Sequence, residues 1–272
     1  MEVTRKSLGG KCIQMTKQKT QYLRPASLYE ALSLKDQFGD KAKFLMGGTF
    51  KPTLEDQIQA LIDLQDAGLD QVEFSEEGMK IGALVSLKTL GEMLALTDFQ
   101  EALSVEFGLN VRNSLSLANF LARANGRSPV LCCLLALRAE AVTLKNPEAV
   151  GLLDYLRSGD SADMVIEVII PSGANLAFES VGRSPKDLPI VCVAAAKFAG
   201  KAVRVAVGGT AEVKSTFTIK NPEYNGRAFI EDVFADASDA WASAEYRQEV
   251  GAILLNRALQ KLDCLPDDQE EK

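Results

Sequence analysis

Residues 43–46 predict a short apolar strand that runs directly into the triplet Gly47-Gly48-Thr49. Glycines at the end of a strand leave several backbone N–H groups unobstructed by a Cβ atom, and such a turn can cradle phosphate oxygens. The segment lacks the G-x-G-x-x-G pattern of dinucleotide-binding folds and the lysine of a P-loop. Two interpretations therefore stay open, a phosphate site and a tight turn that needs positive φ without a ligand, and the segment alone favours the tight turn.

A second triplet, Gly208-Gly209-Thr210, follows residues 202–207, which alternate with the period of a strand. We predict that this triplet is a structural hairpin turn. The two triplets do not belong to a longer internal repeat.

Strand-like and helix-like patterns alternate along the chain. Ser27 with Glu30 forms a capping box that predicts the start of a helix, which ends near Gly39. The periodicity further predicts strands at residues 58–64, 79–84, 139–144 and 165–171, helices at 87–96 and 99–107, and an amphipathic helix at 244–262.

The composition excludes several classes of function. The chain has no histidine, so catalytic triads, Cys-His pairs and histidine general bases are absent. A net charge of -7 predicts no nucleic-acid partner. The length of 272 residues, with 47% hydrophobic and 25% charged residues, is typical of a globular protein of about two domains.

The five cysteines lack the spacing of zinc or iron-sulfur ligands, so we predict no metal site. Cys132 and Cys133 lie in the apolar run of residues 130–137 and are predicted to be buried, inert thiols. The basic N-terminus lacks the apolar core of a signal peptide, and no apolar stretch reaches about 18 residues. We therefore expect a cytoplasmic protein with no contact with a membrane.

Several segments occur in the order and spacing of a known family. In the first half of the chain they are residues 23–31, 44–49, 81–83, 111–113 and 134–140, and in the second half residues 187–196, 203–210 and 243–247. On these segments the chain resembles the FAD-binding medium subunit of molybdenum hydroxylases, as in xanthine dehydrogenase and carbon monoxide dehydrogenase. The resemblance covers residues 22–263, which is nearly the whole chain.

This resemblance implies an α+β fold. It consists of an N-terminal FAD-binding domain of the molybdopterin dehydrogenase type, with two subdomains that hold FAD between them, and a C-terminal α+β flavoprotein domain. Together with the charge and pattern changes along the chain, the resemblance predicts a flexible leader at residues 1–21, the FAD-binding domain at 22–172, the C-terminal domain at 173–265 and an acidic tail at 266–272.

The resemblance also implies two loops that cradle the FAD pyrophosphate. The second loop of the family usually reads Thr-Ile-Gly-Gly-Asn, and counting from Asn113 without a gap places Ala118 and Asn119 on its two glycines. If both positions need positive φ, these replacements are strained and weaken the FAD site. The cofactor-binding residues expected on this basis are Leu45, Met46, Gly47, Gly48, Thr49 and Phe50 of the first loop, with Ser116, Ala118, Asn119 and Val165.

The function implied by the resemblance is that of an electron-transfer oxidoreductase subunit, which passes electrons from iron-sulfur clusters through FAD to NAD or another acceptor. Molybdopterin and [2Fe-2S] clusters would lie only in partner chains, a molybdenum-binding large subunit and an iron-sulfur small subunit. The resemblance to xanthine dehydrogenase suggests a purine or another N-heterocycle as the substrate of the complex. Two alternatives stay open: a degenerate subunit without flavin that serves assembly or scaffolding, and a nucleotide-binding protein unconnected to molybdenum enzymes.

Overall fold

The computed structural model describes residues 20–47, 58–159, 163–184, 187–200, 202–210, 216–219 and 226–264. The chain divides into two compact units. The first comprises Met1–Leu45 and Lys51–Ala67, and the second comprises Met46–Phe50 and Gly68–Lys272. The domain boundaries expected from the sequence resemblance stay a prediction.

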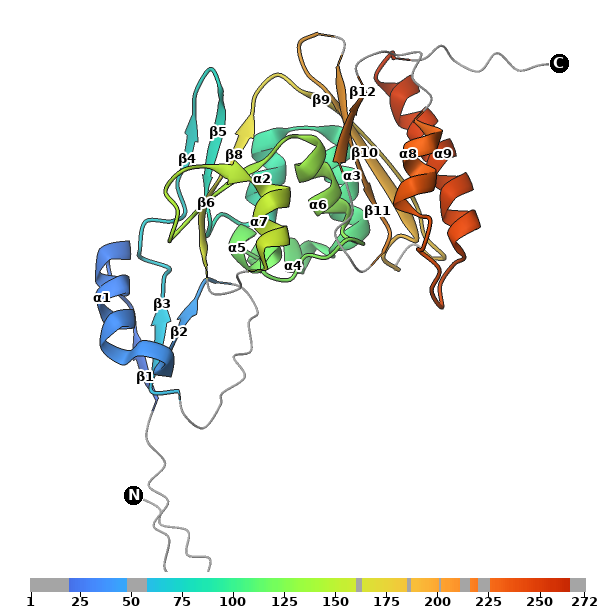
Figure 1. Ribbon diagram of the computed structural model, residues 1–272. Helices are drawn as coiled ribbons and strands as arrows, with labels where there is room; N and C mark the ends of the chain where they lie inside the picture. The colour runs from blue at the N-terminus through green and yellow to red at the C-terminus, as the bar shows by residue number, and fades with distance from the viewer. Residues whose placement is uncertain are drawn as a thin grey trace, which may run out of the picture. The chain divides into compact units, whose positions relative to one another are not determined.

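The first unit is built on a parallel sheet with the strand order β1-β3-β2 (Figure 1). Ser27 caps helix α1 as predicted, because its hydroxyl accepts the N–H of Glu30 at 3.2 Å, and Glu30 Oε2 accepts the N–H of Ala26. Helix α1 ends at Gly39, whose φ of +57° suits glycine. The elements are β1 (Gln21–Leu23), α1 (Leu28–Phe38), the 3-10 turn η1 (Gly39–Lys41), β2 (Ala42–Leu45) and β3 (Ala60–Asp63).

The second unit begins with a five-stranded antiparallel sheet in the order β4-β5-β8-β6-β7. Its strands are β4 (Val72–Phe74), β5 (Gly78–Gly82), β6 (Glu140–Thr143), β7 (Val150–Gly151) and β8 (Val165–Pro171). The helices associated with it are α2 (Leu87–Leu94), α3 (Thr97–Glu106), α4 (Leu109–Ser114), α5 (Leu117–Leu121), α6 (Pro129–Ala136) and α7 (Leu152–Ser158).

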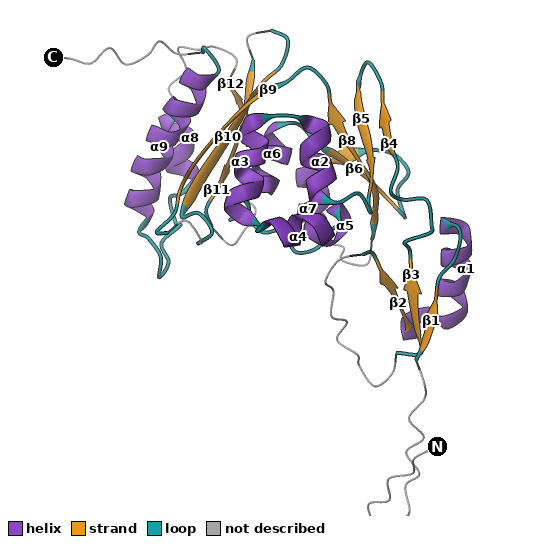
Figure 2. Cartoon of the chain, turned by 180° about the vertical axis from the view of Figure 1, so that it is seen from behind, coloured by secondary structure: helices purple, strands orange, loops and turns teal. Residues whose placement is uncertain are grey.

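A second antiparallel sheet of this unit, in the order β12-β11-β10-β9, lies between two layers of helices (Figures 1 and 2). Helices α3 and α6 cover one face, and α8 and α9 cover the other. The elements are β9 (Asn175–Val181), β10 (Val191–Lys197), β11 (Val203–Gly208), β12 (Thr216–Ile219), α8 (Arg227–Val233) and α9 (Ala244–Lys261).

The C-terminal helix α9 is tied to this sheet and to α3. Leu254 is 1% exposed and faces the sheet, as the amphipathic pattern predicts. Lys261 Nζ forms ion pairs with Asp98 of α3 at 3.2 Å and with Glu179 of β9 at 2.8 Å. It also donates a hydrogen bond to the carbonyl of Phe178. The last turn of α9 is therefore linked to both neighbouring elements.

Cys132 and Cys133 are buried, as predicted, and lie on α6. Burial raises the pKa of the Cys133 thiol well above its ordinary value, so the thiolate form is disfavoured. The sequence did not predict that residues 109–121 form two short helices, α4 and α5. In the described part of the chain, no helix has both the length and the apolar character needed to span a membrane.

Ala95 at the end of α2 gives a first test of the backbone geometry. This exposed residue has φ +52° and ψ +25°, a left-handed conformation in which a Cβ atom is unfavourable. We expect Ala95→Gly to raise the free energy of unfolding by about 0.5–1 kcal/mol. Urea denaturation measures the change. Ala122→Gly is the matched control, because Ala122 caps α5 with a φ of -63° that alanine adopts without strain. We expect this variant to unfold more easily than the wild type. An equal effect of the two substitutions would contradict the prediction.

Glu106 gives a test of pH dependence. Burial raises its pKa to about 7, although hydrogen bonds from Ser128 and the N–H of Val130 oppose the shift. Because the folded pKa lies above the unfolded value of about 4.3, protonated Glu106 is favoured in the folded state. This contribution is fully present below about pH 4 and is lost as the pH rises through about 7.

We therefore expect the wild type to lose up to about 3 kcal/mol of unfolding free energy from this group between pH 5 and pH 8.5. Glu106→Gln should remove that part of the pH dependence, because glutamine keeps an acceptor oxygen but does not ionise. Urea denaturation at the two pH values checks this. The exposed Glu101→Gln in the same helix is the control and should keep the wild-type dependence.

Candidate functional site

The first glycine turn follows strand β2 directly, as the sequence predicts. Leu45 is the last residue of β2, and Gly47 has φ +72°, a conformation that favours glycine. Among the described residues, a Cβ atom on Gly47 would meet Ser116 Cβ, at 3.9 Å, so the backbone conformation is what favours glycine here. Gly48, Thr49 and Phe50, which the sequence also assigns to this loop, lie outside the described residues.

The structure brings the first turn into contact with residues of the second predicted loop. Ser116 Oγ donates a hydrogen bond to the carbonyl of Met46 at 2.6 Å. Asn119 Nδ2 donates to the same carbonyl at 3.3 Å and to the carbonyl of Gly47. Ser116 is 2% and Asn119 is 6% exposed. Two side chains that are almost fully buried therefore bind the carbonyl side of the turn.

The second predicted loop is itself the helix α5. Its first N–H groups have protein acceptors: Leu117 donates to Val85 O at 2.9 Å, Ala118 to Ala83 O at 2.8 Å, and Asn119 to Ser116 Oγ at 3.3 Å. A backbone phosphate cradle needs N–H groups that are free to bind the ligand. These three N–H groups therefore already have protein acceptors, and the role of Ser116, Ala118 and Asn119 as cofactor-binding residues stays a prediction.

The expectation that Ala118 and Asn119 are strained by positive φ is wrong. Both lie within helix α5, and positive φ among the described non-glycine residues occurs at Ala95, Arg138 and Asp263. The physical reason is that Ser116 caps a helical turn here, with its hydroxyl accepting the N–H of Asn119, and residues inside a helix have negative φ. Ala118 is 4% exposed, so its side chain is buried in this turn.

Val165 is the first residue of β8 and is 3% exposed within the core of the second unit. The described hydrogen bonds do not connect it to the glycine turn. Its role as a cofactor-binding residue stays a prediction.

A buried carboxylate that the sequence analysis missed lies beside Leu45. Asp63 ends strand β3, pairs in register with Leu45 and is 3% exposed. Its Oδ2 accepts the hydroxyl of Tyr22, and this hydrogen bond raises the pKa of Tyr22. The carboxyl ends of parallel strands are the usual position of ligand sites in α/β sheets. An aspartate directly after the apolar run of residues 60–62 was the available signal.

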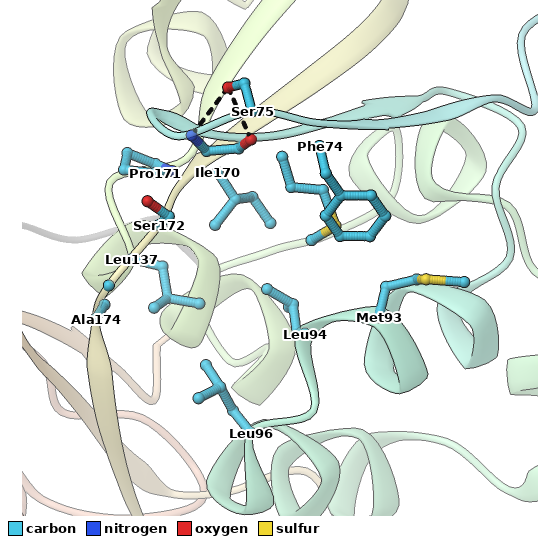
Figure 3. Close-up of a pocket in the computed structure, with 13 residues that line it drawn as sticks. Phe74, Ser75, Met93, Leu94, Leu96, Leu137, Ile170, Pro171, Ser172 and Ala174 are labelled. Atoms are coloured by element: carbon cyan, nitrogen blue, oxygen red, sulfur yellow. Dashed lines mark hydrogen bonds between the residues drawn. The ribbon is translucent and has the colours of Figure 1, made fainter.

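The pocket shown in Figure 3 lies elsewhere in the second unit. It has a volume of about 190 Å³ and lies between the β4–β5 hairpin, the end of β8 and the C-terminal end of α2. Its walls are mainly apolar, with Phe74 and Met93 at 66% and 43% exposure. The predicted site residues that the structure describes do not line it, so the cavity and the Met46-Gly47 turn are separate features.

The second glycine triplet packs against the chain. Gly209 has φ +137°, and a Cβ atom there would lie 2.2 Å from the carbonyl oxygen of Ile190. Its N–H donates to Gly126 O at 2.7 Å, and its carbonyl accepts from the guanidinium of the fully buried Arg247. These close backbone contacts support the structural role that the sequence predicts for this triplet.

Comparison with known proteins identifies the family. Residues 18–173, more than half of the chain, match the family described as the FAD binding domain in molybdopterin dehydrogenase. The chain belongs to this family, whose members are oxidoreductase components. The family predicted from the sequence motifs and the α+β fold of the molybdopterin dehydrogenase type are therefore confirmed.

Two curated relatives match most of the chain. The uncharacterised protein YgfM of Escherichia coli strain K12 is 29% identical over 245 residues, which cover 86% of this chain and 93% of that protein. The carbon monoxide dehydrogenase medium chain of Afipia carboxidovorans is 25% identical over 280 residues, which cover 88% and 95%.

Solved structures confirm the fold at lower sequence identity. A chain of the cyanide-inactivated Cu,Mo-CO dehydrogenase superposes with a TM-score of 0.70 at 20% identity, covering 89% of this chain and 96% of that one. A chain of quinoline 2-oxidoreductase from Pseudomonas putida 86 superposes with a TM-score of 0.66 at 19% identity, covering 91% and 98%.

The packing of Gly209 predicts a purely structural effect of substitution. We expect Gly209→Ala to lower the free energy of unfolding by more than about 2 kcal/mol, because it combines an unfavourable φ with a clash against backbone atoms. Gly200→Ala is the matched control, since Gly200 has φ +113° but open space around its Cβ position. Thermal and urea denaturation compare the two. Equal destabilisation would show that φ alone decides the effect, and a selective loss of FAD binding in the folded Gly209→Ala variant would contradict the structural role.

Proposed function

We propose that this chain is the FAD-binding electron-transfer subunit of a multi-subunit molybdenum hydroxylase. The observation that carries the proposal is the turn at Met46-Gly47. It follows a strand of a parallel sheet, has a positive φ at Gly47, and has its carbonyls bound by Ser116 and Asn119. When the carbonyls of such a turn are bound on one side, the N–H groups that point to the other side are suited to phosphate oxygens.

FAD, when bound, would accept electrons and release them to an acceptor, and this chemistry belongs to the cofactor. The chain would contribute binding and orientation. In this proposal Gly47 lets the backbone approach the pyrophosphate closely, and Ser116 and Asn119 act from the opposite side of the turn. Ala118, whose N–H is bonded to Ala83, contributes no phosphate contact. Electron transfer through a flavin needs no general base, which is consistent with a chain without histidine.

The proposal includes partner chains. The relative from Afipia carboxidovorans is by its name the medium chain of a carbon monoxide dehydrogenase. By analogy, we propose that the molybdenum centre and the [2Fe-2S] clusters lie in a large and a small partner subunit. NAD is the proposed acceptor, and a purine or another N-heterocycle the proposed substrate of the complex. We also retain residues 22–172 and 173–265 as the proposed domains and the cytoplasm as the proposed location.

A second candidate function is an assembly or scaffolding subunit without flavin. It is favoured by one observation, which is that the N–H groups of Leu117, Ala118 and Asn119 are bonded to protein acceptors rather than free. A chain that has lost one of two phosphate loops could retain the fold and its partner surfaces without the cofactor.

Flavin titration distinguishes the two functions. The purified full chain is mixed with FAD, and the bound flavin is measured by absorbance and by the change in flavin fluorescence. A stoichiometric complex, reduced when the partner subunits and their substrate are added, supports the electron-transfer subunit. A chain that assembles with the partners but ignores FAD supports the scaffolding function. A chain that binds FAD but is not reduced by the partners overturns the electron-transfer part alone.

The turn itself is tested by Gly47→Val. Valine at φ +72° is strongly disfavoured and places a branched side chain in the turn, so we expect at least tenfold weaker FAD binding. Gly68→Val is the matched control, because Gly68 has φ +77° and open space around its Cβ position. Flavin fluorescence titration gives both affinities, with circular dichroism as a check of folding. Undiminished FAD affinity in Gly47→Val would remove this turn from the site.

A further inference from the structure

Resting on the proposed function, we infer that Ser116 and Asn119 are positioning residues that hold the Met46-Gly47 turn in the conformation that receives the cofactor phosphates. They act through the carbonyl oxygens of the turn and do not contact the ligand themselves. In this chain the second loop has changed from a phosphate-binding loop into a brace for the first one.

The geometry of the peptide bond carries the first step. In a trans peptide the C=O and N–H groups point to opposite sides of the chain. The carbonyl of Met46 points to Ser116 Oγ and Asn119 Nδ2, at 2.6 and 3.3 Å. The N–H of Gly47 belongs to the same peptide, so it points away from α5. The two side chains therefore fix the direction of a backbone donor on the far side of the turn.

The brace is itself rigidly supported. Helix α5 is held at its start by the bonds from Leu117 and Ala118 to the carbonyls of Val85 and Ala83. The ring of Phe120 in this helix packs edge-to-face on the ring of Phe107, with centroids 5.9 Å apart and an interplanar angle of 86°. The N–H groups that α5 no longer offers to a ligand thus anchor the brace in the core.

The chemistry of the two side chains suits this role. A carbonyl oxygen needs a donor, and a serine hydroxyl and an asparagine amide both supply one without a charge. Buried carbonyls without a partner are costly, so removal of the donors should let the turn leave this conformation. Each lost hydrogen bond should weaken FAD binding roughly fivefold to tenfold.

Two hypotheses about Asn119, a strained replacement of glycine and a positioning residue, predict opposite results for the double glycine variant. If Ala118 and Asn119 were strained replacements of glycine, Ala118→Gly with Asn119→Gly would tighten FAD binding, by about tenfold. If Asn119 is a brace, the same double variant loses the donors to Met46 and Gly47 and introduces two flexible residues into α5. We expect it to bind FAD at least tenfold more weakly than the wild type.

Single substitutions isolate the donors. Asn119→Asp keeps the shape of the side chain but, when ionised, replaces the N–H donor by an acceptor that faces two carbonyls. Asn113→Asp on α4 is the matched control at an exposed position. Ser116→Ala removes the second donor together with the cap of α5, and Ser243→Ala is its control because it removes a comparable serine cap, that of α9. Ser116→Thr keeps the hydroxyl and should restore binding.

Two measurements are made on the full chain. Flavin fluorescence titration gives the affinity for FAD, and amide hydrogen exchange of Gly47 in the absence of FAD reports the order of the turn. We expect Asn119→Asp and Ser116→Ala to weaken FAD binding and to accelerate exchange at Gly47, while Asn113→Asp, Ser243→Ala and Ser116→Thr stay close to the wild type. Circular dichroism identifies any variant that does not fold. If either Asn119→Asp or Ser116→Ala fails to fold, the other one tests the inference.

Unchanged FAD affinity and unchanged Gly47 exchange in both brace variants would overturn the inference, as would tighter binding by the double glycine variant. If the wild type itself does not bind FAD, the proposed function fails. The exchange rates at Gly47 still test whether Ser116 and Asn119 hold the turn, because this measurement needs no flavin.

Discussion

Strand β10 is buried on both of its faces, and the second unit is organised around it. Val191, Val193 and Ala195 face the core under α8 and α9, whereas Cys192, Ala194 and Ala196 face the core that contains α6. Residues with small side chains on the α6 side let this helix approach the sheet closely. Because successive side chains of the strand point into different cores, a bulky or polar substitution in β10 would disturb the helical layer that its side chain faces, and the strand as a whole supports both layers.

The conformation of the glycine turn depends on the same packing. Leu117 and Phe120 of α5 belong to the core that includes α6 and the inner face of β10. Asn119 lies on the same short helix and reaches the carbonyls of Met46 and Gly47. A continuous set of packed residues thus connects the central sheet to the turn. Glycine adopts the φ of +72° at Gly47 readily, and the buried donors Ser116 and Asn119 bind the carbonyls of the turn in this conformation.

The sequence predicted the elements whose signals are local. The cap at Ser27, the strand before Gly47 and the inward position of Leu254 follow from spacing and side-chain type, and the structure agrees with each. It did not predict α5, because five residues carry too little periodicity to identify a helix. Nor did it predict the contacts of Asn119 with Met46 and Gly47, which are more than 70 residues away in sequence and are brought near by tertiary packing.

If the second predicted loop corresponds to the glycine loop of the family, its two replaced glycines change the kind of donor that the proposed site offers. A glycine loop presents backbone N–H groups directly to an anion, whereas α5 uses the N–H groups of Leu117 and Ala118 to bind Val85 and Ala83. Donation to the turn then comes from the side chain of Asn119 and is directed at carbonyl oxygens. In the proposed site, the backbone donors for the cofactor phosphates would therefore come from the Met46-Gly47 turn, and the order of that turn would depend on α5. On the inference drawn above, contact with the ligand would be the part of the turn, and holding the turn in place would be the part of the helix beside it.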